Sequence, residues 1–150
     1  MRRPWCEHWN RSLGNRSILA DPRREDARDL INAKIKYREE FRPFAPSILA
    51  EAVDEYLVDV AADPFMQQVY PIREEKRAEL PAVTHEDGTG RLQAVHQETN
   101  GLYHRLISAF AERTGTPVVL NTSFNENEAH RRVARAAARA GNTAGSFDEY

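Results

Sequence analysis

The sequence feature that most constrains the fold is a short apolar run followed at once by uncharged polar residues. Residues 117–120 (PVVL) are typical of a buried strand, and residues 121–125 (NTSFN) follow directly. Ligand sites of open α/β sheets lie where strands end. We therefore expect Asn121, Ser123 and Asn125 at a binding site, where amides and hydroxyls suit a base, a ribose or a carbonyl oxygen. A serine nucleophile is disfavoured, because no Gly-x-Ser-x-Gly elbow surrounds Ser123.

The spacing of apolar residues predicts the other elements. Strands are expected at residues 17–20, 44–49 and 66–72, and helices at residues 24–35, 51–58 and 100–113. Residues 81–85 and 91–96 flank an EDGTG turn, which predicts a β-hairpin. Phe65, Met66 and Tyr70 are expected in the core. Because strands outnumber a strict alternation of strand and helix, the expected fold class is α/β with a mixed sheet.

Composition limits the class of protein. A chain of 150 residues with 41% hydrophobic and 29% charged residues suits a single globular domain. The net charge of -2 gives no general case for nucleic-acid or membrane binding. Cys6 is the only cysteine, which excludes an intrachain disulfide, and no zinc-ligand spacing occurs. The sequence shows no signal peptide and no long apolar run, so a cytoplasmic protein is expected.

Arginine carries most of the positive charge, since only three of the 21 basic residues are lysines. The planar guanidinium suits phosphate, although a GC-rich coding sequence would favour arginine equally. Arg16 and Ser17 precede a predicted strand and follow Gly14, whose backbone allows amides to approach an anion closely. This cluster predicts a phosphate contact or, alternatively, an ion pair between Arg16 and Asp21.

A second basic cluster consists of Lys36, Arg38 and Arg42, interleaved with aromatic residues. On an extended segment these three cations can converge on one face, which predicts strong anion binding. The alternative is a solvated surface on which Glu39 and Glu40 neutralise them.

A third cluster surrounds the predicted hairpin turn. There Asp87 could face a magnesium-bound triphosphate, Arg91 a phosphate, and His85 could move a proton near neutral pH. The alternative is a turn in which Asp87 and Thr89 only satisfy backbone donors. Taken together, the clusters predict a site for a phosphorylated ligand.

Four strings of the sequence resemble one family in both order and spacing. They are LGNRSILADPR (residues 13–23), KYREEFRPFAPS (36–47), PAVTHEDGTGRLQ (81–93) and TGTPVVLNTSFN (114–125). These strings closely resemble the C-terminal domain of NodU/CmcH-type carbamoyltransferases. The resemblance implies a single YrdC-like α/β domain, in which helices flank a twisted mixed sheet.

The resemblance also implies a function. In that family the C-terminal domain binds ATP, accompanied by Mg2+, and carbamoyl phosphate, and makes carbamoyl adenylate. By motif position it implies ligand contacts at Arg16, Ser17, Lys36, Arg38, Arg91 and Ser123. We assign catalysis to Lys36, Arg38 and Arg91, and ligand binding to Arg16, Ser17, Arg42, His85, Asp87, Asn121, Ser123 and Asn125. No protein ligand to a metal is expected.

The sequence departs from the family pattern towards both ends. WNRS stands at residues 9–12 where the family has GPRA, and an Ala/Arg-rich segment follows Glu128 where the family has a closing strand. We therefore expect an irregular lead-in at residues 1–11, the domain at residues 12–128, incomplete at its C-terminus, and a mobile tail at residues 129–150. Loss of the closing strand predicts an exposed sheet edge near residues 118–120.

Two functions follow from these observations. The first is a carbamoyltransferase C-terminal domain that makes carbamoyl adenylate and needs a separate N-terminal domain in trans as its partner for transfer to an acceptor hydroxyl. The alternative is a non-catalytic nucleotide- or RNA-binding remnant of the same fold. Small-molecule substrates are the expected partners, whereas a membrane or nucleic acid is not expected.

Overall fold

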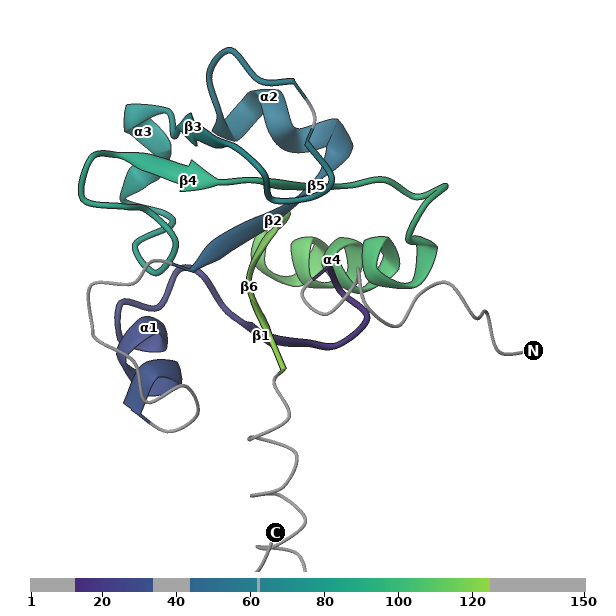
Figure 1. Ribbon diagram of the computed structural model, residues 1–150, viewed down its shortest axis with the longest axis horizontal. Coiled ribbons are helices and arrows are strands. Elements are labelled where there is room, and N and C mark those ends of the chain that lie inside the picture. The colour runs from purple at the N-terminus through teal and green to yellow at the C-terminus, as the bar shows by residue number, and fades with distance from the viewer. Residues whose placement is uncertain (1–12, 34–43, 62, 125–150) are drawn as a thin grey trace, which may run out of the picture.

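The structure is a computed structural model that describes residues 13–33, 44–61 and 63–124 (Figure 1). Along these residues the elements are β1 (Ser17–Ala20), α1 (Asp26–Ile31), β2 (Ala45–Leu49), the 3-10 turn η2 (Ala50–Ala52), α2 (Val53–Tyr56), β3 (Val69–Pro71), α3 (Glu74–Arg77), β4 (Thr89–Arg91), β5 (Gln93–Val95), α4 (Gly101–Thr114) and β6 (Val118–Ser123).

Within the described residues, the main sheet has four strands in the order β1-β6-β2-β5. β6 runs antiparallel to both of its neighbours, whereas β5 runs parallel to β2. β3 and β4 form a separate antiparallel pair. This mixed sheet with flanking helices confirms the predicted α/β class.

The two faces of the main sheet pack into different cores. On one face, Leu49, Val95 and Val119 contact Tyr103 and Ile107 of α4. On the other face, a larger core joins the sheet to α1, α2 and β3 through Ala27, Ile31, Ile48, Val53, Tyr56, Tyr70, Ile72, Ala94, Val118 and Leu120. Figure 1 shows α4 and α1 on opposite sides of β6 and β1. α4 is therefore the helix that covers the first face.

The ends of α4 confirm the predicted helix. Asn100 is its N-cap, and the side chain of Asn100 accepts a hydrogen bond from the Tyr103 backbone at 3.4 Å. Gly115 ends the helix in the left-handed conformation, at φ 77°. A polar N-cap and a C-terminal glycine satisfy backbone groups that a helix leaves unpaired at its ends.

The predicted hairpin is wrong. Residues 81–83 form a turn and residues 84–85 belong to no strand, and β4 pairs instead with β3, with Tyr70 opposite Gly90. Neighbouring Ala82 and Val83 are both buried, at 1% and 0% exposure. Their segment is held by local hydrogen bonds instead of a strand partner, since the N–H groups of Val83 and Thr84 both donate to the Leu80 carbonyl, at 3.2 and 3.1 Å.

The strand predicted at residues 66–72 is shorter than expected. The Asp63 carboxylate accepts hydrogen bonds from the backbone of Phe65, Gln67 and Gln68. These bonds hold residues 63–68 in a loop, in which Met66 adopts φ 57°. Met66 and Tyr70 are buried as predicted, but Phe65 is 60% exposed, because the loop turns its side chain away from the core.

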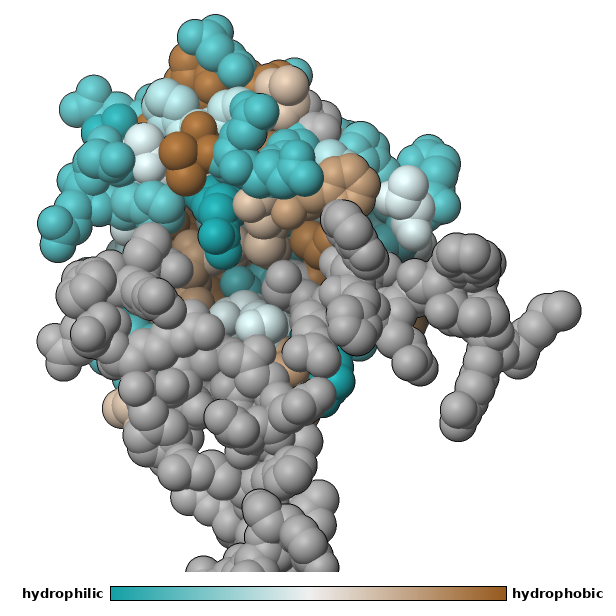
Figure 2. Space-filling model, viewed as in Figure 1, coloured by the Kyte–Doolittle hydropathy of each residue, from teal (hydrophilic) through white to brown (hydrophobic). Residues whose placement is uncertain are grey.

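The expected sheet edge is also misplaced. Residues 118–120 are buried in β6, which lies inside the sheet because β1 pairs along its outer side. Figure 2 shows mostly polar residues on the described part of one molecular face, with apolar residues in small separate areas. None of the helices in the described ranges is long and apolar enough to cross a membrane.

Candidate ligand-binding site

Polar side chains gather on the α4-covered face, at one end of the main sheet. The strand register places Ser17 opposite Ser123, Ala45 opposite Asn121, and Ser47 opposite Gln93. Paired residues point to the same face, and every second residue along a strand returns to it. We call Ser17, Ser47, Gln93, Asn121 and Ser123 the polar patch. The starts of β1, β2 and β5 meet the end of β6 there, so one sheet end collects polar groups from four strands.

Three members of the polar patch form a closed hydrogen-bonded triangle. The Ser47 hydroxyl donates to Gln93 Oε1 at 2.6 Å, and Asn121 Nδ2 donates to Ser47 Oγ at 3.0 Å and to Gln93 Oε1 at 2.9 Å. Their exposures are 0%, 3% and 1% for Ser47, Gln93 and Asn121. Because each comes from a different strand, the triangle fixes uncharged polar atoms across β2, β5 and β6.

The loop before Ser17 is fixed by the start of α4. Asn100 Nδ2 donates to the Leu13 carbonyl at 2.9 Å, and the Gly14 N–H donates to Ser17 Oγ at 3.0 Å. The Tyr103 ring packs so closely that a Cβ on Gly14 would lie 2.3 Å from Tyr103 Cδ1. Gly14 also has φ 96°, a conformation that favours glycine. Gly14 is thus needed for the close approach of the Tyr103 ring, whereas the approach of its backbone to an anion stays a prediction.

Arg16 lies next to the end of β6. The Phe124 N–H donates to the Arg16 carbonyl at 2.9 Å, and the Arg16 guanidinium lies 6.0 Å from the centre of the Phe124 ring. Asp21, the alternative ion-pair partner, contacts Arg23 instead, at 2.7 Å. The exposed Arg16 side chain therefore stands at the sheet end that carries the polar patch.

The turn with His85 and Asp87 is held by Thr89. Both the N–H and the hydroxyl of Thr89 donate to Asp87 Oδ1, at 2.9 and 2.7 Å, and His85 Nδ1 lies 3.0 Å from Thr89 Oγ1. Since the Thr89 proton is directed at Asp87, His85 Nδ1 must donate to Thr89, which leaves Nε2 unprotonated. In the described part of the chain, this buried Nε2 has no hydrogen-bond partner. Burial lowers the pKa of His85, and the nearby Arg91 charge also lowers it against the opposing effect of Asp87.

Arg91 ends β4 and lies two residues before Gln93 in the chain. Leu92 between them is buried in the larger core, and the Arg91 charge lies close enough to His85 to lower the pKa of that histidine. Arg91 is exposed, and its side chain forms no hydrogen bond or ion pair with any residue that the structure describes. It is therefore available for an anionic ligand.

The structure thus groups some of the predicted site residues and leaves others apart. Ser17, Asn121 and Ser123 share the polar patch, whereas the side chains of His85 and Asp87 are hydrogen-bonded to Thr89 within their own turn. Asn121 lies inside β6 rather than after it, because the strand continues to Ser123. Lys36, Arg38, Arg42 and Asn125 lie outside the described residues.

Sequence reasoning missed Ser47 and Gln93 as site residues. Both occupy buried strand positions, at which a polar side chain needs a hydrogen-bond partner. That signal was present in the sequence, since Ser47 follows Ala-Pro and precedes Ile-Leu in an otherwise apolar strand. The sequence does not show that β2 pairs with β5, and this pairing brings Ser47 and Gln93 together.

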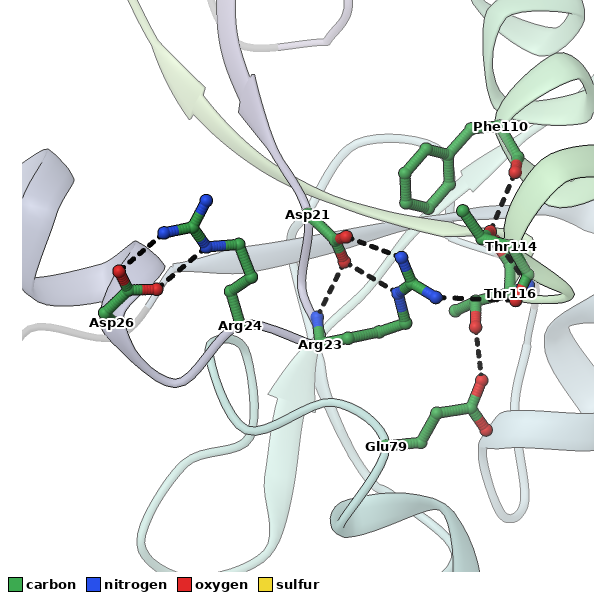
Figure 3. Close-up of polar contacts among 8 residues, drawn as sticks. All are labelled: Asp21, Arg23, Arg24, Asp26, Glu79, Phe110, Thr114 and Thr116. Carbon is green, nitrogen blue, oxygen red and sulfur yellow. Dashed lines mark hydrogen bonds and ion pairs between the residues drawn. The ribbon is translucent and has the colours of Figure 1, made fainter.

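The other end of the sheet carries charged contacts instead (Figure 3). Arg23 pairs with Asp21, lies 5.6 Å from the centre of the Phe110 ring, and approaches the Thr114 carbonyl at 3.5 Å. The hydrogen bonds from Arg23 hold the pKa of Asp21 below its ordinary value, against an opposing effect of burial. These contacts tie the end of β1 to the end of α4.

Glu79 joins this end of the sheet to α3. It accepts hydrogen bonds from Thr116 Oγ1 and from the Tyr56 hydroxyl at 3.2 Å, and Lys76 lies 3.5 Å away. Burial raises the pKa of Glu79, but the Thr116 hydrogen bond and the Lys76 charge outweigh it and the pKa is lowered. Within residues 13–33, 44–61 and 63–124, no three His, Cys, Asp or Glu side chains are grouped to hold a metal.

The described residues form a mixed α/β domain with an uncharged polar patch at one end of its main sheet. The chain belongs to the family described as Carbamoyltransferase C-terminus, whose sequence profile matches residues 3–144. This confirms the resemblance found in the four sequence strings.

Individual relatives support the same assignment. The chain is similar to Nodulation protein NolNO of Sinorhizobium fredii, with 56% identity over 120 residues, covering 78% of this chain and 18% of that protein. It is also similar to 3'-hydroxymethylcephem-O-carbamoyltransferase of Amycolatopsis lactamdurans, with 43% identity over 117 residues, covering 78% and 22%. Nodulation protein U of Rhizobium tropici is 36% identical over 115 residues, covering 77% and 20%. The chain thus spans about a fifth of the length of these curated relatives.

Proposed function

We propose that this domain binds ATP and carbamoyl phosphate at the polar patch and converts them to carbamoyl adenylate. The observation that carries the proposal is the buried uncharged triangle of Ser47, Gln93 and Asn121, in a domain of the carbamoyltransferase family in which the exposed Arg91 lies two residues before Gln93 in the chain. Uncharged donors suit a carbamoyl group, and arginine suits phosphate.

The proposed reaction balances with one water molecule. Water cleaves carbamoyl phosphate to carbamate and phosphate, and a carbamate oxygen then attacks the α-phosphorus of ATP. The bond from the α-phosphorus to the bridging oxygen breaks, and pyrophosphate leaves with the electron pair. Two anionic substrates repel each other, so fixed cations and hydrogen-bond donors are the main contribution that a protein can make to such a step.

The residues of this chain take separate roles in the proposal. Arg16 and Arg91 neutralise phosphate charge, together with Lys36, Arg38 and Arg42. Mg2+ accompanies ATP, and Asp87 fits this ion, because it is exposed and the hydrogen bonds from Thr89 engage only its Oδ1. Ser17, Ser123 and Asn125 donate to uncharged oxygens. Transfer of the carbamoyl group to a hydroxyl belongs, in this proposal, to a separate domain acting in trans.

Exchange of labelled pyrophosphate into ATP tests the adenylation step. Exchange that depends on carbamoyl phosphate is expected with the purified chain. Absence of exchange, combined with a nucleotide-induced rise in the melting temperature, would favour the non-catalytic binding domain. Absence of both would refute the proposed ligands.

Arginine variants test the location of the site. Arg91→Ala and Arg16→Ala should each weaken binding of ATP or carbamoyl phosphate about tenfold or more, because a charge-assisted hydrogen bond contributes about 1.5–3 kcal/mol. Arg113→Ala is the matched control, since Arg113 is also exposed but lies at the opposite end of α4 from Tyr103. Equal dissociation constants in all three variants, measured by titration calorimetry, would move the site elsewhere.

A further inference from the structure

Gln93 uses both acceptor positions of its side-chain oxygen inside the polar patch. Its Oε1 accepts from the Ser47 hydroxyl at 2.6 Å and from Asn121 Nδ2 at 2.9 Å. An amide oxygen has two lone pairs, so its capacity is filled. The orientation of the Gln93 carboxamide is fixed as a result.

The NH2 group of Gln93 is the remaining part of that carboxamide. It lies on the side away from Ser47 and Asn121, since both of those contact the oxygen. Among the residues that the structure describes, no hydrogen bond accepts from this NH2 group, although Gln93 is only 3% exposed. The fully buried side-chain atoms without a partner in the described residues do not include Gln93 Nε2, so this nitrogen keeps access to solvent or to a ligand. The NH2 group of Gln93 is therefore available to donate a hydrogen bond to a ligand.

The surroundings of Gln93 indicate which chemistry the acceptor has. The other members of the polar patch are serines and an asparagine, and Ala45 opposite Asn121 is apolar and buried. All of these groups are uncharged, whereas the charged Arg16 and Arg91 are exposed. A neutral donor in an uncharged, buried environment fits a carbonyl oxygen better than a phosphate dianion, whose desolvation requires opposite charge.

We propose that Gln93 is the specificity-determining residue that reads the acyl end of the substrate, by donating from its NH2 group to the carbamoyl carbonyl oxygen. This rests on the proposed function, in which carbamoyl phosphate occupies the polar patch. Ser47 and Asn121 are positioning residues. If the Gln93 carboxamide alone turned over, its NH2 would face the NH2 of Asn121, and two donors cannot bond to each other.

Calorimetric titration with three probes tests the assignment. Carbamoyl phosphate and acetyl phosphate both carry an acyl carbonyl, whereas inorganic phosphate has none. Gln93→Met should weaken binding of the two acyl phosphates about tenfold, the loss expected for one buried hydrogen bond, and should change phosphate binding less than twofold. Gln97→Met is the matched control, because Gln97 is exposed, and it should bind all three probes as the unchanged protein does.

A second variant covers the possibility that Gln93→Met does not fold. Gln93→Glu keeps an oxygen for Ser47 and Asn121 but replaces the NH2 donors. Its negative charge weakens every anion, so the measured quantity is the ratio of the dissociation constants of phosphate and carbamoyl phosphate, which should fall about tenfold. An unchanged ratio, or an equal loss for all three probes in Gln93→Met, overturns the role of Gln93. Failure of the unchanged protein to bind any probe overturns the proposed function itself.

Discussion

Replacing Gly14 by alanine should destabilise the domain more than the same replacement at two other glycines. Gly14 has φ 96°, and an L-residue in a left-handed conformation costs roughly 1–2 kcal/mol. A Cβ at Gly14 would also lie 2.3, 2.6 and 2.8 Å from three atoms of the Tyr103 ring. Tyr103 is 3% exposed and packs in the α4 core, so the ring has little room to retreat.

The two costs add to a measurable loss of stability. Forcing extra atoms into a packed core costs roughly 1–3 kcal/mol, so Gly14→Ala should lower the free energy of unfolding by roughly 2–5 kcal/mol. Gly115 has φ 77° with nothing within 4 Å of its added Cβ, so Gly115→Ala isolates the backbone cost of about 1–2 kcal/mol. Gly101 has neither constraint, and Gly101→Ala should be neutral or stabilising by up to about 1 kcal/mol, because alanine favours helix.

Urea unfolding of the three variants provides the measurement. The expected order of stability is Gly101→Ala, Gly115→Ala, then Gly14→Ala, and the clash predicts that Tyr103→Ala partly rescues Gly14→Ala in the double variant. A loss at Gly14 no larger than the loss at Gly115 would refute the steric part of this reasoning. Strict additivity in the double variant would refute it equally, because the two side chains would then be independent.

Three further predictions concern single side chains. Asn100→Ala removes the N-cap of α4 and should lower the free energy of unfolding by about 1–2 kcal/mol in urea titrations. The lowered pKa of His85 means that the unfolded chain binds its proton first, so stability should fall as pH decreases below 6.5, and His85→Asn should flatten that dependence in thermal scans. The lowered pKa of Glu79 contributes stability that is lost as pH falls below 4.5, and Thr116→Val should reduce this acid-dependent loss in the same scans.

The elements that sequence predicts well are those specified by neighbouring residues. α4 begins at Asn100 and ends at Gly115 because both residues satisfy local backbone needs, and both signals are visible in the sequence. The strand in residues 17–20 is likewise limited by Asp21 and Pro22, since proline cannot donate to a ladder. Local chemistry is sufficient for such features.

The parts that sequence predicts badly depend on distant partners. The EDGTG turn is present, with the Gly88 N–H donating to the His85 carbonyl at 2.9 Å, but the partner strand of β4 comes from Val69–Pro71. The EDGTG sequence predicts that the chain reverses direction there. It does not predict which strand pairs with β4. The sheet edge predicted near residues 118–120 is wrong for the same reason, because β1 and β6 are far apart in the sequence and their pairing cannot be read from neighbouring residues.

Some residues of the candidate site can be predicted from local sequence, and others depend on strand pairing. Asn121 and Ser123 were predicted as site residues because polar residues follow an apolar run, and the structure places both on the polar patch. Ser47 and Gln93 become visible only when β2 and β5 pair, since each alone is one polar residue in a buried strand. A triangle across three strands is a property of the register, which single-strand patterns do not contain.

α4 links the two ends of the sheet and so connects the site to the stability of the domain. At its start, Asn100 and Tyr103 hold the loop that leads into Ser17, and at its end Phe110 and Thr114 contact Arg23, which follows β1. Both ends of β1 are thus fixed by one helix, although among the described strands β1 pairs on one side only, with β6. A strand with a single partner has fewer hydrogen bonds to hold its register. The contacts of α4 therefore supply the constraint that keeps Ser17 opposite Ser123 and the polar patch assembled.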